Sequence, residues 1–484
     1  MEAPATAGAE GIEITGLCYD SRRARRGDLF FGLSGLRQDG QAYVRQALAA
    51  GAVAAVVGRD FHEPGLPLVQ VEEPRRALAR AAARFCGDPS RALTVVGVTG
   101  TNGKTTTTWM LEAVFRAAGR VPGVLGTTGV RVAGEARPSA FTTPEAPELQ
   151  GLLREMRERG VEAVALELSS HALAQRRCYA LECDVAVFTN LSHDHLDYHG
   201  TLEAYLDAKL MLFDGRNNPR PAKRTTAVVN LDDPAAERVC AAAAGAGQRV
   251  VGFGRSPDAA VRIAQVSPHA GGLDLSLEEG GERTPVRLAL LGRFNAWNAA
   301  GAFAAARALG IEGTVAARGL AGTPGVPGRL ERIAEGQPFE VVVDYAHTPD
   351  ALQRALAAVR EHARGRVLVV FGCGGDRDRA KRPVMGRAAR AGADQVWVTS
   401  DNPRSEDPAA IAAEIVAGAG GPVHLELERS RAIARALEAA RPGDAVLIAG
   451  KGHETTQTIG DRVLPFDDRE VARGLLRAHG GSGR

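Results

Sequence analysis

The sequence predicts an α/β protein with three domains: a smaller N-terminal α/β domain, a central domain with a mostly parallel P-loop-type sheet, and a C-terminal domain with a Rossmann-like sheet. Three observations predict this architecture. At 484 residues the chain is too long for one hydrophobic core, since domains hold about 150 residues each. Strand and helix patterns alternate almost throughout, which favours parallel sheets. Loop-like breaks at residues 86–92 and 322–331 separate the units, so we place the domains at residues 1–89, 90–325 and 326–484.

The composition is that of a globular protein without a strong charge bias. Hydrophobic residues make up 45% and charged residues 24% of the chain, and the formal net charge of +2 gives no field that would attract nucleic acid or a membrane. No apolar run reaches the length of a membrane span, and residues 1–16 lack the basic and apolar regions of a signal peptide. The six cysteines form no C-x-x-C pair, which argues against structural zinc and for a reducing compartment. We expect a cytoplasmic monomer that neither binds nucleic acid nor inserts into a membrane.

Seven predicted strands are each followed by a polar, glycine-rich or charged segment. They span residues 92–98, 161–168, 184–190, 339–344, 366–372, 394–400 and 444–450. Open α/β sheets bind ligands at the carboxyl ends of their strands. A purely structural origin would scatter such residues over both ends of the strands. The one-sided placement therefore predicts a ligand site in the central sheet and another in the C-terminal sheet, facing one cleft.

The segment after the first of these strands, TGTNGKTTT, predicts a phosphate-binding loop. Its spacing departs from the common P-loop, which has a glycine where a valine stands here. Gly100 and Gly103 let the backbone approach an anion, and the helix that follows offers its N–H groups. Lys104 adds a charge for the β- and γ-phosphates, and Thr105 or Thr106 supplies a hydroxyl to Mg²⁺. A glycine turn with a surface lysine is the alternative, which the strand–loop–helix context disfavours.

Three further side chains are candidates near this loop. Glu167 ends a predicted strand, and His195 lies in HDHLDYHG after another. On residue type alone, Glu167 suits a helix cap and His195 an ordinary loop histidine. Lys209 stands among apolar residues in LEAYLDAKLMLF and therefore has a chance of pointing inward, although a solvated helix lysine is the commoner case. A buried lysine tends to lose its proton, and a neutral amine can add CO₂ to form a carbamate with two metal-binding oxygens.

The chain resembles the Mur ligase family, which also includes folylpolyglutamate and cyanophycin synthetases. The resemblance extends over nearly the whole sequence, through TGTNGKT, SSHAL, FTNLSHDHLDYHG, GRFNAWN, DYAHTPDAL, FGCGGDRDRAKRP, DNPRSEDP and AGKGHE. No single short motif is specific, but the set is. The resemblance explains the spacing of the phosphate loop, and it implies an ADP-forming amide ligase that uses ATP and Mg²⁺ and forms an acyl phosphate.

The resemblance also implies roles for individual residues. For ATP binding they are Gly100, Thr101, Asn102, Gly103, Lys104, Thr105, Thr106, Asn295, Arg329 and Asp344. Asn295 would lie near adenine, although a helix cap remains an alternative; Arg329 would meet the γ-phosphate and Asp344 the ribose. The implied metal ligands are Thr105, Glu167, His195 and Lys209, the lysine as its carbamate (N6-carboxylysine). The implied catalytic residues are Lys104, Lys209 and His195.

The resemblance implies two further substrates, and with them peptidoglycan precursor synthesis, cell-wall growth and cell division. UDP-N-acetylmuramoyl-L-alanyl-D-glutamate would be held by the N-terminal domain and by Ser21, Thr142, Thr143, Ser169, Gln175 and Arg177. The incoming amino acid would be meso-diaminopimelate, because D-N-P-R at this place accompanies its ligases. Its residues would be Arg377, Asp401, Asn402, Pro403, Arg404, Gly450 and Glu454. Arginine suits a carboxylate and Glu454 an ammonium group. His193 departs from the family pattern, which has arginine there, so the resemblance assigns it no role.

Three alternatives stay open at the level of sequence. The same reaction with L-lysine differs only in the amino acid, and a folylpolyglutamate synthase or a cyanophycin-type ligase shares the phosphate loop. The segments DNPR and YDSRRARRGDLFFGL argue against the folate and cyanophycin-type enzymes. A P-loop switch or ATPase without ligase activity would not need a second sheet lined with amino-acid-binding charges.

Overall fold

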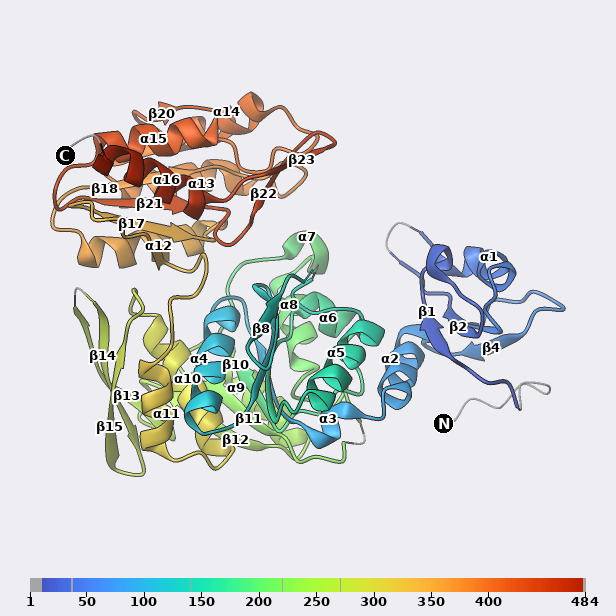
Figure 1. The fold of residues 1–484 in the computed structure, drawn as a ribbon. Coiled ribbons are helices and arrows are strands. Elements are labelled where there is room, and N and C mark those ends of the chain that lie inside the picture. The colour runs from blue at the N-terminus through green and yellow to red at the C-terminus, as the bar shows by residue number, and fades with distance from the viewer. Residues whose placement is uncertain (1–10, 36–37, 140, 220, 270, 482–484) are drawn as a thin grey trace.

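The computed structural model describes residues 11–35, 38–139, 141–219, 221–269 and 271–481 (Figure 1). It confirms the predicted α/β class with mostly parallel sheets. The described residues form sheets of four, eleven, six and two strands. The three larger sheets define what we call the N-terminal, central and C-terminal domains. In Figure 1 the N-terminal domain lies to one side of the central domain, and the C-terminal domain lies above it.

The N-terminal domain is a four-stranded parallel sheet in the order β1-β2-β3-β4. Its strands are β1 (Gly16–Cys18), β2 (Asp28–Phe31), β3 (Ala54–Gly58) and β4 (Leu68–Val71). Its helices are η1 (Ser21–Arg23), η2 (Gly40–Tyr43), α1 (Val44–Ala49) and α2 (Pro74–Phe85), followed by the short α3 (Pro89–Ala92). Helix α2 begins with proline, which loses nothing at a position whose N–H has no partner within the helix. It packs on α5 (Ala146–Glu158) of the central domain and so connects the two domains.

The central domain is built on the eleven-stranded sheet, in the order β15-β14-β13-β12-β11-β10-β5-β9-β6-β7-β8. Its strands are β5 (Thr94–Thr99), β6 (Pro122–Gly126), β7 (Gly129–Val132), β8 (Glu135–Arg137), β9 (Ala163–Glu167), β10 (Val185–Phe188), β11 (Thr226–Asn230), β12 (Arg249–Gly254), β13 (Val261–His269), β14 (Gly272–Glu279) and β15 (Glu282–Leu288). In this order, the seven neighbouring strands β13-β12-β11-β10-β5-β9-β6 all pair in parallel. Antiparallel strands extend both edges, which the alternation of strands and helices did not predict.

Helices cover both faces of the parallel part of this sheet (Figure 1). They are α4 (Lys104–Ala117), α5 (Ala146–Glu158), α6 (Ser170–Ala174), α7 (Leu196–His199), α8 (Leu202–Leu210), α9 (Ala236–Gly245), α10 (Asn295–Ala308) and α11 (Gly313–Ala321). Successive residues of a strand point to opposite faces. Accordingly Val96 and Val98 pack with α4, α10 and α11, whereas Val95 packs with residues of α5 and α9. Strands buried on both faces explain why their sequences are continuously apolar.

The C-terminal domain is built on the six-stranded sheet, in the order β16-β17-β21-β18-β19-β20, which is parallel apart from β16. Its strands are β16 (Glu331–Arg332), β17 (Glu340–Asp344), β18 (Val367–Phe371), β19 (Gln395–Val398), β20 (His424–Leu425) and β21 (Ala445–Ala449), with a separate hairpin of β22 (Thr456–Ile459) and β23 (Arg462–Pro465). Its helices are α12 (Pro349–His362), α13 (Lys381–Gly392), α14 (Pro408–Ala419), α15 (Arg429–Ala439) and α16 (Asp468–Gly481).

The seven predicted strands all form, and they are neighbours within their sheets. In the central sheet β10, β5 and β9 lie side by side, and in the C-terminal sheet β17, β21, β18 and β19 do. Because these strands are parallel, the polar segments that follow them gather at one edge of each sheet. Among the helices that the structure describes, none combines the length and the apolar character needed to cross a membrane.

Candidate active site between the central and C-terminal domains

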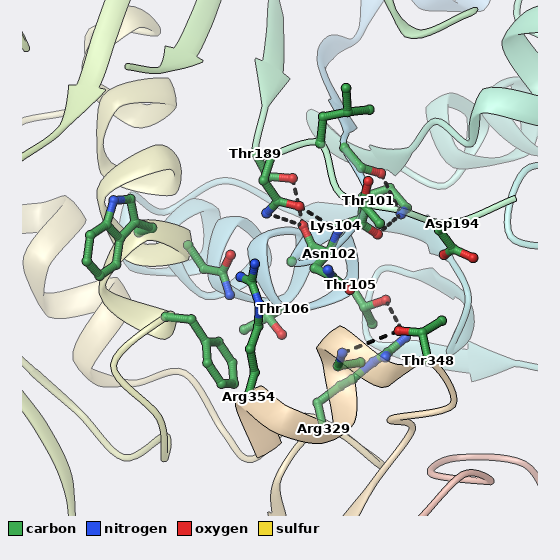
Figure 2. Close-up of a pocket in the computed structure, with 18 of the residues that line it drawn as sticks. Thr101, Asn102, Lys104, Thr105, Thr106, Thr189, Asp194, Arg329, Thr348 and Arg354 are labelled. Carbon is green, nitrogen blue, oxygen red and sulfur yellow. Dashed lines mark hydrogen bonds between the residues drawn. The ribbon is translucent and has the colours of Figure 1, made fainter. Parts of the chain in front are cut away.

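A cavity of about 630 Å³ lies between the central and C-terminal domains. The central domain contributes residues 100–106, the ends of β9 and β10, and the start of α10, and the C-terminal domain contributes residues 344–348 and part of α12. Figure 2 shows Arg329, Thr348 and Arg354 approaching the loop that carries Thr101 to Thr106. All ten residues predicted to bind ATP line this cavity: Gly100, Thr101, Asn102, Gly103, Lys104, Thr105, Thr106, Asn295, Arg329 and Asp344.

The loop between β5 and α4 requires glycine at two positions. Gly100 has φ +146°, and a Cβ atom there would lie 1.9 Å from Oγ1 of Thr189. Gly103 has φ +91°, and its Cβ would lie 2.2 Å from Oδ1 of Asn298. Any side chain at these places would clash with the segment after β10 or with α10. The loop therefore packs closely against these two segments, and the amino end of α4 faces the cavity. The backbone N–H groups at this end of a helix suit an anion.

The segment after β10 holds this loop in place. The backbone N–H of Asn102 donates to Oδ1 of Asn190 at 2.9 Å, and Oγ1 of Thr189 donates to the carbonyl of Asn102 at 2.7 Å. The sequence reasoning assigned no role to Thr189 or Asn190. Their signal was available, since both stand at the end of the strand predicted at residues 184–190.

Lys104 begins α4, and its ammonium group is held by the loop itself. Its Nζ donates to the carbonyl oxygens of Gly100 and Thr101, each at 2.8 Å. Burial lowers the pKa of Lys104, whereas the nearby carboxylates of Glu167 and Asp194 oppose that shift. The structure thus places one fixed cation at the amino end of a helix. There the cation and the backbone N–H groups of the helix can both bind the oxygens of a phosphate.

Glu167 lies at the end of β9 and is almost fully buried. Its carboxylate accepts hydrogen bonds from Oγ1 of Thr105 at 3.1 Å and from the backbone N–H and Oγ1 of Thr127 at 2.8 and 2.9 Å. Arg329 reaches Thr105 from the other domain, with Nη2 3.4 Å from Oγ1 (Figure 2). Thr105 is therefore a point where the two domains meet. Thr127 was not predicted, and nothing in its local sequence marks it.

Lys209 points inward, which is the less common of the two orientations that the sequence left open. Its side chain is buried, with Nζ 4.1 Å from the centroid of the Tyr205 ring, and no hydrogen-bond partner for this ammonium is found among the described residues. Burial holds the pKa of Lys209 well below its usual value, the positive charge of Lys104 lowers it further, and Asp194 opposes both. The side chain is therefore predisposed to be a neutral amine.

His195 lines the same cavity as Lys209 and stands immediately before α7, with φ +53°. Its ring makes an edge contact with the ring of His171, at 4.8 Å between centroids. Burial lowers the pKa of His195 to about 4, although Asp194 raises it. The imidazole is thus neutral at physiological pH and has a lone pair free for a ligand. His193 is exposed and does not line the cavity.

The oxygen donors in the cavity fit a magnesium ion bound together with phosphate. No group of three or more His, Cys, Asp and Glu side chains is arranged to hold a metal within the described part of the chain. Mg²⁺ does not need such a cage, because it is usually held by one or two carboxylates plus substrate phosphates and waters. Glu167 and the hydroxyl of Thr105 meet that requirement beside the phosphate loop, and Thr106 also lines the cavity.

Asn295 occupies the first position of α10 and does not cap it. Its Nδ2 donates to the carbonyl of Leu291 at 2.7 Å, and its Oδ1 accepts from Nδ2 of Asn298 at 2.8 Å. The capping position is held by Phe294, without a side-chain hydrogen bond. Phe294 and Trp297 line this end of the cavity, where their aromatic surface suits a flat heterocycle. Their signal lay in GRFNAWN, from which only the asparagines were assigned.

Asp344 lies at the end of β17 and supports the connector between the domains. Its two carboxylate oxygens accept from the backbone N–H of Leu330 at 2.7 Å and of Ala346 at 2.8 Å. Burial raises its pKa, which Arg329 and the two backbone N–H groups oppose. Asp344 lines the cavity and at the same time positions the segment that carries Arg329.

Four of the six residues predicted to hold the muramoyl dipeptide form one hydrogen-bonded group. Oγ1 of Thr143 accepts from the backbone N–H of Ser169 at 3.1 Å, and Nη1 of Arg177 donates to the carbonyl of Thr143 at 3.1 Å. Nη2 of Arg177 also donates to Oε1 of Gln175 at 2.7 Å, and its Nε lies 3.0 Å from Oε1 of Glu145. Glu145, which the sequence reasoning missed, therefore already balances the charge of Arg177.

The other two residues of that set lie at different distances from the cavity. Thr142 lines it, as does Ser169, and hydrogen-bonds Thr127 at 3.1 Å. Ser21 is remote, in the N-terminal domain, where its hydroxyl bonds Gln46 at 3.1 Å. A second cavity, of about 230 Å³, lies next to this segment. It is lined by Gly16, Leu17, Cys18, Tyr19, Asp20, Arg23, Arg25, Asp28 and Glu148.

The residues predicted to hold the amino acid gather at the ends of β18, β19 and β21, and they do not line the 630 Å³ cavity. Of the four C-terminal segments, the one after β17 lines this cavity beside the phosphate loop, and the expectation that the two ligand sites face one cleft stays a prediction. The members of this group are Arg377, Asp401, Asn402, Pro403, Arg404, Gly450 and Glu454. Gly450 packs directly on Asp401, to whose Oδ2 an added Cβ would lie 2.5 Å away.

Within this group, Glu454 already has a cationic partner. Its Oε2 accepts from Nδ2 of Asn402 at 2.9 Å and from Nζ of the fully buried Lys451 at 3.1 Å. Lys451 was not predicted, although it stands in the AGKGHE motif. The two arginines of this group differ from Lys451, because they have no such carboxylate partner among the described residues. Arg377 is exposed and Arg404 half-buried, and neither forms an ion pair with a carboxylate among the described residues.

Comparison with known proteins matches the chain to one family over most of its length. Family models match at residues 13–86 (Mur ligase family, catalytic domain), 98–306 (Mur ligase middle domain) and 328–452 (Mur ligase, glutamate ligase domain). A UDP-N-acetylmuramoyl-L-alanyl-D-glutamate--2,6-diaminopimelate ligase of Solibacter usitatus is 44% identical, over 97% of this chain and 94% of its own. The ligase of that name from Geobacillus thermodenitrificans is 45% identical, over 96% and 95%. A solved structure of a ligase of that name is 34% identical, with a TM-score of 0.70 over 96% of this chain and 95% of its own. The chain therefore belongs to the Mur ligase family.

Proposed function

We propose that this chain is an ADP-forming ligase that adds meso-diaminopimelate to UDP-N-acetylmuramoyl-L-alanyl-D-glutamate, a step of peptidoglycan precursor synthesis. The observation that carries the proposal is the identity of 44 to 45% to ligases of that name over nearly the whole chain. The cavity supports it, because a phosphate loop, a fixed lysine and an arginine from the opposite domain surround one space.

The reaction begins with transfer of a phosphoryl group. The γ-carboxylate of the D-glutamyl residue attacks the γ-phosphorus of ATP, and the bond to ADP breaks, which leaves an acyl phosphate. The amine of meso-diaminopimelate then attacks the acyl carbon, and phosphate leaves with the electron pair of the broken C–O bond while the amine loses a proton. Both steps move negative charge over phosphate oxygens, which fixed cations stabilise.

The roles of the chain's own residues follow from their positions. Lys104 and the N–H groups at the start of α4 would orient and stabilise the β- and γ-phosphates. Arg329 would add a second cation from the C-terminal domain, so that catalysis depends on the approach of the two domains. The aromatic end of the cavity near Asn295 would receive adenine, with Asp344 near the ribose.

Magnesium fits the same place. Glu167 and Thr105 would hold one ion, and His195 with the carbamate of Lys209 would hold a second; when bound, such ions neutralise charge on the phosphate oxygens. The residues Thr142, Thr143, Ser169, Gln175 and Arg177 would position the dipeptide of the nucleotide substrate, and Ser21 its uridine diphosphate end. We also propose that the protein acts as a monomer in the cytoplasm without nucleic-acid partners, consistent with its net charge of +2.

We predict that Lys209 is carbamylated in the active protein. The buried amine has a lowered pKa, and a neutral amine adds CO₂ where its cation does not. Carbon-13 NMR with labelled bicarbonate should give a carbamate signal that disappears in Lys209→Arg. The half-buried Lys223, ion-paired with Asp184 at 2.7 Å, provides the matched control, because Lys223→Arg should leave the signal unchanged. An active protein that shows no such signal would contradict the prediction.

The proposed reaction can be tested by leaving out one substrate at a time. Phosphate release from ATP should require both UDP-N-acetylmuramoyl-L-alanyl-D-glutamate and meso-diaminopimelate. Phosphate release with neither substrate would favour a P-loop ATPase, and turnover with a folate and glutamate would favour a folylpolyglutamate synthase. Efficient use of L-lysine in place of meso-diaminopimelate would identify the lysine-adding variant of the reaction.

A further inference from the structure

Two loops of the C-terminal domain carry the unpaired arginines of the proposed amino-acid site. One, residues 374–377, follows β18 and carries Arg377; the other, residues 401–406, follows β19 and carries Arg404. The loops touch along their backbones. The N–H of Gly375 donates to the carbonyl of Asn402 at 2.9 Å, and a Cβ on Gly375 would lie 1.9 Å from the carbonyl oxygen of Pro403.

Side chains reinforce this contact in both directions. Oε1 of Glu406, on the second loop, accepts from the backbone N–H of Asp376 on the first at 2.6 Å. The carboxylate of Asp376 in turn accepts from the backbone N–H of Ser405 at 3.2 Å and from its Oγ at 2.7 Å. Each loop therefore supplies one carboxylate that binds the backbone of the other.

A buried arginine connects this contact to the body of the domain. Arg382, in the first turn of α13, has no exposed side-chain surface. Its Nη2 lies 2.7 Å from Oε1 of Glu406, and its Nη1 lies 3.0 Å from Oε2 of Glu414 on α14. The two helices form a rigid support, because they pack so closely that a Cβ on Gly386 would lie 2.1 Å from the carbonyl of Ile415.

The backbone at both arginine-bearing loops is strained in a way that the network must stabilise. Asp376 has φ +52° and Arg404 has φ +51°, the left-handed region that residues with a side chain seldom adopt. Such conformations persist where the surroundings determine them. Here Glu406 binds the N–H of Asp376, and the backbone of Arg404 bonds Thr458 and Gly460.

We infer that Arg382, Glu406 and Asp376 are positioning residues that set the spacing and orientation of Arg377 and Arg404, and thereby the affinity for the amino-acid substrate. This inference rests on the proposed function. The three residues do not line the cavity of the phosphate loop, so they should leave the use of ATP and of the UDP-linked substrate unchanged. A displacement of about 1 Å in a binding group costs up to about 100-fold, which sets the expected scale.

The test compares Glu406→Ala with Glu414→Ala in the full-length protein. Both changes remove one carboxylate from Arg382, but only Glu406 also binds the loop of Arg377. Glu406→Ala should raise KM for meso-diaminopimelate by about 10- to 100-fold and leave KM for ATP and for the UDP-linked dipeptide within about threefold. Glu414→Ala should change all three by less than about threefold. Glu406→Gln, which keeps an oxygen for the N–H of Asp376, should recover part of the loss.

A second variant avoids the buried arginine altogether. Asp376→Gly removes the bonds to Ser405 at an exposed position where glycine tolerates the positive φ, and it should raise KM for meso-diaminopimelate in the same selective way. If Glu406→Ala and Asp376→Gly leave that KM within threefold, or raise all three KM values equally, the positioning role is wrong. Wild-type protein that does not use meso-diaminopimelate would instead overturn the proposed function, and this inference with it.

Discussion

Replacing Lys104 by alanine should abolish turnover, with a loss of at least about 100- to 1,000-fold in kcat. Its ammonium is the only lysine cation at the phosphate loop among the residues described, fixed at 2.8 Å by the carbonyls of Gly100 and Thr101. In the proposed reaction this charge is needed twice, when the γ-phosphoryl group is transferred and when phosphate leaves. Binding of ATP should weaken as well, because the same cation contacts the phosphates before the reaction.

The measurement is phosphate release at saturating substrates, with thermal unfolding as the check on folding. Lys223→Ala is the matched control. Lys223 is also a partly buried lysine of the central domain, paired with Asp184 at the amino end of β10, the opposite edge of the sheet from the phosphate loop. Lys223→Ala should keep kcat within about threefold, as expected for a change that touches no reacting group. A fully active Lys104→Ala would show that the reaction occurs elsewhere in the molecule.

Replacing Arg404 by alanine should impair the use of meso-diaminopimelate far more than the use of L-lysine. The two amino acids differ chiefly in the distal carboxylate, which lysine lacks. Arg404 carries a half-buried guanidinium that bonds the carbonyl of Gly375 and has no carboxylate partner among the described residues. For a half-buried pair the appropriate scale is that of a charged hydrogen bond, about 1.5–3 kcal/mol, or roughly 10- to 150-fold in specificity.

The quantity to measure is kcat/KM for both amino acids in wild type and in Arg404→Ala. Wild type should prefer meso-diaminopimelate, and the variant should bring the two values to within about tenfold, because the cost of leaving the guanidinium unpaired disappears as well. Arg435→Ala is the control. Arg435 lies on α15 and is paired with Glu426 at 3.1 Å, so its removal should change neither value. Equal losses for both amino acids would mean that Arg404 supports the loop and does not select the substrate.

The parts of the site that could be predicted from sequence are those built by one continuous segment. The strand, loop and helix around Lys104 were predictable because glycines, a lysine and an apolar strand stand together in the chain. The apolar neighbours of Lys209 in α8 raised the inward orientation as an alternative, but the sequence did not decide it. The α/β class followed from the alternation of strands and helices, whereas the antiparallel strands at both edges of the central sheet did not, because edge position depends on pairing across the whole chain.

The parts that could not be predicted depend on contacts between distant segments. Glu167 is fixed by Thr127, 40 residues away along the chain, and Arg177 is balanced by Glu145. Lys451 stands in the AGKGHE motif, but its hydrogen bond to Asn402 depends on the contact between the loops after β19 and β21. Which of the polar segments line the cavity beside the phosphate loop also depends on how the domains pack, and no local sequence pattern records that packing.

The most direct measurement of the central claim is the mass of the product formed in competition. The protein is incubated with ATP, UDP-N-acetylmuramoyl-L-alanyl-D-glutamate, and equal concentrations of meso-diaminopimelate and L-lysine. The nucleotide products are then separated, and their masses are measured by mass spectrometry. We predict a UDP-muramoyl tripeptide that carries diaminopimelate as the main product, one ADP per tripeptide, and no product without ATP. A tripeptide that carries mainly lysine, or ATP hydrolysis without any tripeptide, would contradict the proposed function.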